Sequence, residues 1–203
     1  MSLISSHFKQ PNKCPSSAGF GIIELLVSIS IMVIISAVIM VQQGSFNGAV
    51  LLRGEAYDIA LTAREVQLNA VSINDVTGNF RSLLGLHFDL NSNQQYKIFR
   101  DGGTNNGYYD DAGEMFGKQG YLDGRFEIRE IWVNQNSGGR VAASQVSAVF
   151  ERPNFDARFF IGPNNEASAS SIEIVVAKKG VSISASDPAR TVEITSTGQI
   201  SVQ

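Results

Sequence analysis

The stretch that decides the fold is residues 22–41, which read IIELLVSISIMVIISAVIMV. This run contains a single charge, Glu24, and as a helix it would extend about 30 Å, the thickness of the hydrocarbon core of a bilayer. Residues 1–19 before it carry Lys9 and Lys13 and no acidic residue. The positive-inside rule therefore predicts a single membrane span with a cytoplasmic N-terminus, and a remainder that lies outside the membrane.

Two common explanations of such a segment fit less well. A secretory signal peptide has an apolar region of about 7–15 residues followed by a small-residue cleavage site, whereas this run is longer and continues into Met40-Val41-Gln42-Gln43-Gly44. An ordinary single-span anchor explains the length and the orientation. It does not explain Glu24, because a carboxylate inside an apolar helix is costly and usually functional.

The junction before the apolar run offers a third explanation. Residues 19–27 read GFGIIELLV, which closely resembles the cleavage signal of type IV prepilins and type II secretion pseudopilins. That signal is a Gly that ends a basic leader, then Phe, then a hydrophobic helix whose fifth residue is Glu. The chain departs from the family at Gly21, where Thr or Ser is usual.

The resemblance implies specific chemistry at this junction. A membrane-embedded prepilin peptidase would cut between Gly19 and Phe20 on the cytoplasmic side and methylate the new amine of Phe20. Gly19 suits a site where the backbone enters a protease cleft without side-chain obstruction. Glu24 would offset the positive amine of a neighbouring subunit during assembly, since opposite charges attract strongly in a low dielectric. Cleavage would also remove Cys14, which is the chain's one cysteine.

The resemblance also implies partners and a location. The partners are prepilin peptidase, other pilin or pseudopilin subunits, the inner-membrane assembly platform and membrane lipid. The subunit would first sit in the inner membrane and then in a pilus (fimbrium) or pseudopilus filament.

Beyond the membrane segment the helix is expected to continue, so that it covers residues 20–76. No proline lies between Pro15 and Pro153, so nothing forces a break. Apolar residues recur there at alternating spacings of four and three: Leu52, Ala56, Ile59, Ala63, Val66, Ala70 and Ile73. Such a stripe normally faces a core. We therefore expect it to pack on the protein's own sheet; a coiled coil with a partner helix is disfavoured because the stripe is short and rich in Ala.

From about Thr77 the periodicity changes to two, which predicts β-strands. Alternating or apolar runs separated by Asn, Gly, Ser and Pro occur at residues 84–90, 126–133, 146–150, 171–176, 181–183 and 192–195, with a last hairpin through Ser196-Thr197-Gly198. Residues 78–203 are thus expected to form a head of seven or eight short strands. A helix followed by antiparallel strands is an α+β fold. The ending VEITSTGQISV resembles H-type pseudopilins and their minor-pilin relatives.

One loop is a candidate calcium site. Residues 99–114 gather hard oxygen ligands between turn-forming glycines, as calcium requires; the candidate ligands are Asp101, Asn105, Asp110, Asp111 and Glu114. The EF-hand pattern fails, because Gly103 takes a ligand position, Asn106 takes the glycine position and Glu114 comes two residues late. An exposed hairpin loop without any metal has the same composition, so both interpretations stay open.

Composition argues against other classes. The formal net charge is −3 and no block of basic residues occurs, which gives no electrostatic support for nucleic-acid binding. The chain has two histidines and lacks the G-x-S-x-G, Walker A and H-E-x-x-H motifs, so we expect no enzyme. His87 alternates with apolar neighbours and is expected to be solvated, Trp132 is expected to be buried, and Tyr108-Tyr109 is a candidate exposed contact.

These observations predict a structural subunit of a type IV pilus or a type II secretion pseudopilus. In this hypothesis prepilin peptidase processes the subunit, which then polymerises through its N-terminal helix. The alternative is a single-pass, membrane-anchored β-domain that binds a surface ligand and never polymerises.

Overall fold

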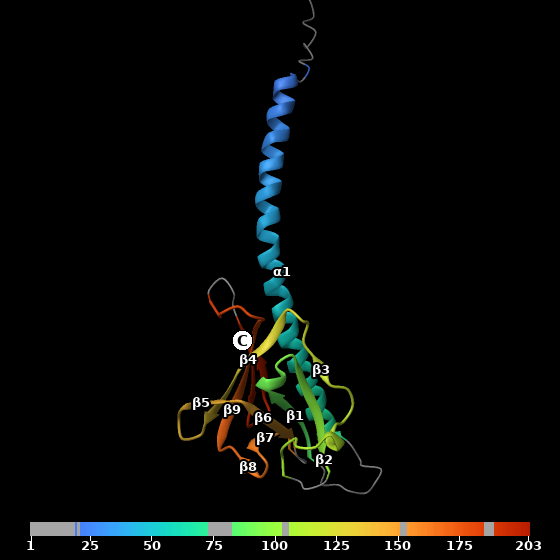
Figure 1. Ribbon diagram of the computed structural model, residues 1–203, viewed down its shortest axis with the longest axis vertical. Helices are drawn as coiled ribbons and strands as arrows, with labels where there is room; N and C mark the ends of the chain where they lie inside the picture. The colour runs from blue at the N-terminus through green and yellow to red at the C-terminus, as the bar shows by residue number, and fades with distance from the viewer. Residues whose placement is uncertain (1–18, 20, 73–82, 103–105, 151–153, 185–188) are drawn as a thin grey trace, which may run out of the picture. The chain divides into compact units, whose positions relative to one another are not determined.

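The computed structural model describes residues 19, 21–72, 83–102, 106–150, 154–184 and 189–203. The chain divides into two compact units, Met1–Gly44 and Ser45–Gln203, and the helix α1 (Ile22–Ser72) has residues in both (Figure 1). Two single-turn 3-10 helices, η1 (Leu90–Ser92) and η2 (Ala112–Glu114), lie in loops of the second unit. The strands are β1 (Leu83–Asp89), β2 (Gln95–Asp101), β3 (Gly120–Tyr121), β4 (Phe126–Gln135), β5 (Arg140–Ala143), β6 (Gln145–Phe150), β7 (Ala157–Gly162), β8 (Asn165–Glu166), β9 (Ala169–Lys178), β10 (Arg190–Thr195) and β11 (Ile200–Val202).

The first unit contains the apolar segment predicted above. Ile22–Val41 has a mean hydropathy of 2.8 and none of it is buried. Its length and apolar composition are those of a membrane-spanning helix, and a signal sequence near the N-terminus has the same properties. The described part of the chain therefore has one apolar N-terminal helix, suited to anchor the protein in a membrane or to direct its secretion.

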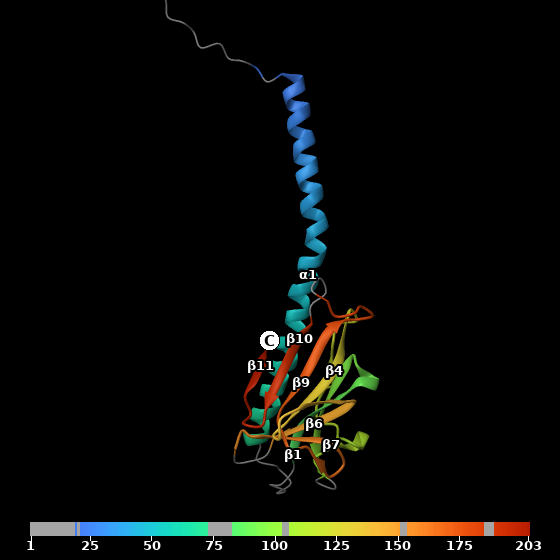
Figure 2. The same ribbon diagram turned by 90° about the vertical axis from the view of Figure 1, so that its left-hand side faces the viewer.

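The second unit is a sandwich of two antiparallel sheets. One sheet has the strand order β3-β2-β1-β6-β7-β8 and is called sheet A here; the other, sheet B, has the order β11-β10-β9-β4-β5. Figure 2 shows β11, β10, β9 and β4 of sheet B side by side. Buried side chains from β1, β2, β4, β6, β7, β9 and β10 join in one hydrophobic core between the two sheets.

The second-unit part of α1 contributes to the same core. Six of the seven predicted stripe residues are buried there: Leu52, Ala56, Ile59, Ala63, Val66 and Ala70. Ile73 lies outside the described residues. The prediction that this face packs on the protein's own sheets is therefore confirmed for the residues described, and α+β is the fold class.

The helix closes one side of the sandwich by contacting both sheets. Thr62 Oγ1 lies 3.0 Å from the hydroxyl of Tyr96 in β2 of sheet A. Gln67, which is fully buried, donates from Nε2 to the carbonyl of Gly198 in the β10–β11 turn of sheet B, over 2.9 Å. On the opposite side the sheets end in β8 and β5.

Most predicted strands are confirmed, namely those at β1, β4, β6, β9 and β10, and the last hairpin is the β10–β11 pair. The strand predicted at residues 181–183 is wrong. Gly180 turns the chain with a φ of 71°, and the residues that follow are an irregular segment. The described residues form eleven strands and not the seven or eight expected. Strand β5 is one of those that went unpredicted, because its residues are largely exposed and polar or small, so the alternation that marks a half-buried strand is weak.

Candidate functional site

The predicted processing junction lies at the start of α1. Gly19 is exposed, whereas Phe20 lies outside the described residues. Glu24 stands in the first turn of the helix, where its backbone N–H donates to Gly21 O over 3.0 Å. A carboxylate in a first turn is favoured by the helix dipole. The roles assigned to Gly19, Phe20 and Glu24 stay predictions.

The apolar side chains of the first unit are uncovered. Large residues such as Ile22, Met40 and Val41 are 89%, 78% and 80% exposed. No cation pairs with the Glu24 carboxylate among the residues that the structure describes. A helix of this kind requires either lipid or other apolar helices around it, because water would face a continuous hydrophobic surface.

The candidate loop of the head is folded onto the outer face of sheet A. Its residues 106–109 cover His87 in the central strand β1, so that His87 is 4% exposed and Tyr108 is 7% exposed. The ring of His87 lies 5.1 Å from that of Tyr108 and 5.4 Å from that of Tyr109, centroid to centroid. The prediction of a solvated His87 is therefore wrong, and Tyr108 is not the exposed contact that was expected.

A second hydrophobic cluster explains why the loop packs there. It joins Tyr108 to four outward-facing residues of the sheet: Leu83, Phe99, Val149 and Phe160. Gly107 adopts a φ of 76° and lies directly against the ring of Phe160. A residue with a Cβ would overlap that ring, so glycine is required both for the turn and for the close approach.

The covered histidine has an unusual electrostatic environment. Burial lowers the pKa of His87 to about 4, and the positive charge of Lys97 in β2 acts in the same direction, while Asp89 opposes it. The Nδ1 atom lies 2.9 Å from Ser147 Oγ, so the neutral ring keeps a hydrogen-bond partner. Burying a neutral imidazole costs far less than burying a charged one.

The candidate calcium ligands that the structure describes have hydrogen-bond partners within the protein. Asp101 is fully buried and its Oδ2 accepts from Gly107 N over 2.6 Å, Asp110 Oδ2 accepts from Asn106 Nδ2 over 2.7 Å, and Asp111 caps η2 through Gly113 N. Glu114 Oε2 accepts from the backbone N–H of Asp110. Burial, together with the negative charges of Asp110 and Asp101, raises the pKa of the Glu114 carboxyl.

One candidate ligand keeps an oxygen without a protein partner. Of the candidate carboxylate oxygens, Asp101 Oδ1 is the buried one without a hydrogen-bond partner. No group of three His, Cys, Asp or Glu side chains placed to hold a metal occurs among the described residues. Asn105 lies outside them, so the calcium prediction stays a prediction.

Trp132 differs from its expected position. It is half-buried on the outer face of sheet B, with the guanidinium of Arg140 4.3 Å from its ring and its Nε1 donating to Glu130 over 2.8 Å. Arg140 also pairs with Glu173 on β9. A tryptophan engaged in this way is a structural element of the sheet surface.

Comparison with protein-family models, with curated proteins and with solved structures finds no match for this chain.

Proposed function

We propose that this protein is a structural subunit of a type IV pilus or a type II secretion pseudopilus. The observation that carries the proposal is the uncovered apolar helix Ile22–Val41, which has one carboxylate, Glu24, in its first turn and begins three residues after Gly19. A simple membrane anchor requires the apolar residues but not the carboxylate of Glu24. A helix that leaves the membrane and packs among identical helices can use both, because each carboxylate meets the amine of a neighbour.

The second-unit part of α1 supports the same proposal. The face of α1 that points away from the core carries exposed apolar side chains, with Tyr57 at 42%, Leu61 at 65% and Leu68 at 51%. Side chains of this size on one helix face are typical of a surface that contacts another molecule. Lateral packing between subunits would cover them.

The proposal is tested by co-expressing the full chain with a prepilin peptidase and measuring the intact mass and N-terminal sequence of the membrane-bound product. We expect a chain that begins at Phe20 with a methylated amine. Gly19→Leu should remain uncut because its side chain would obstruct the scissile bond. Glu24→Gln should be cut but should fail to enter sheared filaments, because it lacks the charge that pairs with the neighbouring amine.

A chain that keeps residues 1–19, with the peptidase active on a second substrate in the same cells, would overturn the proposal. The protein would then be a single-pass, membrane-anchored β-domain. If Glu24→Gln enters filaments as the wild type does, cleavage by the peptidase would still stand, but Glu24 would not be the residue that pairs with the neighbouring amine.

A further inference from the structure

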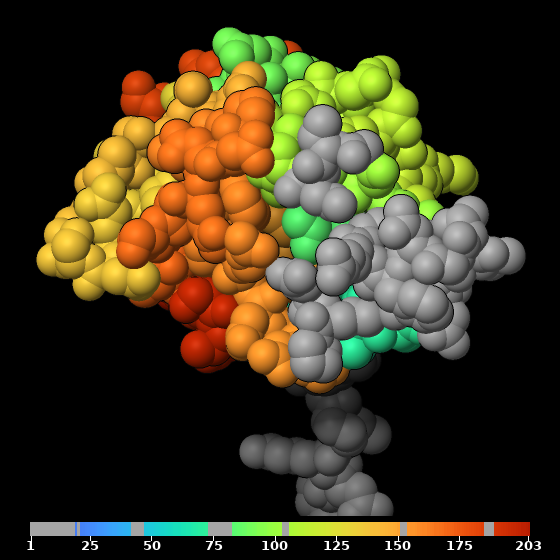
Figure 3. Space-filling model, turned by 90° about the horizontal axis from the view of Figure 1, so that it is seen from below, coloured from blue at the N-terminus to red at the C-terminus, as the bar shows by residue number. Residues whose placement is uncertain are grey.

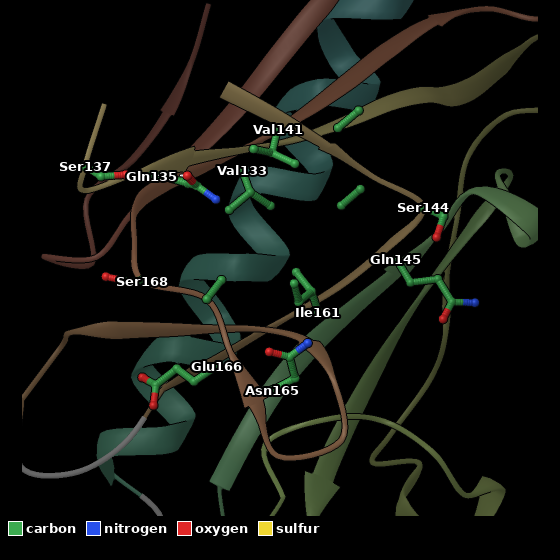
Figure 4. Close-up of a pocket in the computed structure, with 13 residues that line it drawn as sticks. Val133, Gln135, Ser137, Val141, Ser144, Gln145, Ile161, Asn165, Glu166 and Ser168 are labelled. Atoms are coloured by element: carbon green, nitrogen blue, oxygen red, sulfur yellow. Dashed lines mark hydrogen bonds between the residues drawn. The ribbon is translucent and has the colours of Figure 1, made fainter. Parts of the chain in front are cut away.

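A groove opens on the side of the sandwich opposite α1, between the edge strands of the two sheets. It has a volume of about 610 Å³, which is within the range of specific ligand sites. Figure 3 shows the β4–β5 region and the β7–β8 region side by side on one face of the head. In Figure 4 Val133, Val141 and Ile161 surround one space.

The floor of this groove is apolar and partly exposed. Val141 is 47% exposed and Ile161 is 43% exposed, although both belong to strands of a folded sandwich. The side-chain amides of Gln135 and Asn165 stand beside this floor, whereas the amide oxygen of Gln145 accepts a hydrogen bond from the hydroxyl of Tyr108. Amides can both donate and accept hydrogen bonds, which suits a backbone peptide group as a ligand.

Among the described residues that line the groove, Glu166 is the one that carries a charge. The guanidinium of Arg158 holds its carboxylate through two hydrogen bonds of 2.8 and 2.7 Å. A charged ligand would find no opposite charge to pair with. An uncharged ligand is therefore favoured.

Strand β5 presents backbone hydrogen-bonding groups at the edge of the groove. Gln135 N donates to Gly139 O over 2.9 Å, so the alternation of an antiparallel ladder makes Val133–Val141 the next hydrogen-bonded pair. The N–H and C=O groups of Ala142 then point away from β4. Because β5 ends sheet B, these groups offer one donor and one acceptor to an incoming strand.

We propose that this groove binds an extended, uncharged peptide segment of a partner protein as an additional strand on β5. Backbone hydrogen bonds to Ala142 fix the direction of the peptide, and alternate apolar side chains of the peptide enter between Val141 and Ile161. The inference does not depend on filament assembly, since the groove belongs to the head alone. It goes beyond the proposed structural role by giving the head a peptide-binding activity.

The test uses the full chain in detergent micelles and a panel of fluorescein-labelled, uncharged peptides in which threonine alternates with valine, isoleucine or phenylalanine. Binding is measured by fluorescence anisotropy. Ala142→Pro removes the outward N–H without removing a bond of the β4–β5 ladder, and Ala142→Ser keeps that N–H as the matched control. We expect saturable binding by the wild type and by Ala142→Ser, and an affinity about tenfold lower for Ala142→Pro.

Ile161→Glu is a second variant, because it places a carboxylate in the groove at a position that tolerates exposure. It should weaken binding at least as much as Ala142→Pro while the melting temperature stays unchanged. The proposal is overturned if no peptide binds at about 1 mM, the weak limit of specific affinity, or if binding by Ala142→Pro equals that of the wild type. The proposal is also overturned if no peptide binds and the chain self-associates in a way that Ala142→Pro abolishes. The occupant of the groove would then be a second copy of the chain.

Discussion

The buried histidine of the head makes folding stability depend on pH in a way that is worked out from its environment. His87 has a pKa of about 4 in the folded protein, against about 6.5 in an unfolded chain. Between these values the unfolded chain binds a proton that the folded chain does not. Stability is therefore complete above about pH 6.5 and is lost as the pH falls towards 4, below which the dependence on this group ends.

The size of the effect follows from the same two values. Linkage gives a loss of about 2 kcal/mol between pH 7.5 and pH 5, and about 3 kcal/mol by pH 4. This loss is a large part of the stability of an ordinary domain. His87 is almost fully buried, so solvent screening reduces the effect little.

The assay is urea unfolding of the full chain in detergent, followed by the fluorescence of Trp132, the one tryptophan. The variant His87→Gln removes the titrating group and keeps a polar side chain near Ser147. Carboxylates that titrate in the same range affect both proteins, so the difference between them isolates His87. We expect the wild type to lose about 2 kcal/mol more than the variant on going from pH 7.5 to pH 5.

Equal pH dependence in the two proteins would refute the reasoning. It would mean that the imidazole titrates near its ordinary value, and hence that the loop 106–109 opens easily enough to hydrate it. A nuclear magnetic resonance titration of the ring protons distinguishes the two cases directly, because it gives the pKa of His87 in the folded protein.

Two further predictions concern single side chains. Gly107→Ala should lower the free energy of unfolding by about 3 kcal/mol, because a methyl group at this positive φ would overlap the ring of Phe160. The control is Gly117→Ala, which has nearly the same φ but open space around it and should cost about 1 kcal/mol. Equal losses for the two variants in urea unfolding would show that the Phe160 contact contributes nothing. Gln67→Leu should lower the free energy of unfolding by about 3 kcal/mol, because the carbonyls of Phe155 and Gly198 lose their buried hydrogen-bond donor. A change of less than 0.5 kcal/mol in urea unfolding, the usual range for a surface substitution, would mean that water replaces the amide.

The parts of the fold that the sequence predicted are those governed by local periodicity. The buried stripe of α1 is visible because its residues recur with the period of a helix, and the strands β1, β4, β6, β9 and β10 are visible because alternate residues are apolar. Each such pattern needs only its own segment of chain. For this reason the α+β class follows from the sequence.

The features that escaped prediction depend on segments far apart in the chain. His87 lies on the outer face of β1, as its alternation with apolar residues predicts. Residues 106–109 cover it, and no sequence pattern near His87 predicts this contact. Gln67 gave a weak signal, since it lies four residues after Ala63 and so shares the buried face of the helix. Its partner at Gly198 is 131 residues away, which no local pattern records.

The peptide groove was missed for a further reason, and this reason bears on function. Its strand β5 is exposed and short, so its residues lack the apolar alternation by which strands are recognised. The same lack of burial means that substitutions there leave the core intact, whereas substitutions in the α1 stripe disturb the residues that join both sheets. Stability and binding therefore reside on opposite sides of the sandwich. A variant at Ala142 or Ile161 that loses binding at an unchanged melting temperature is the consequence expected from that separation.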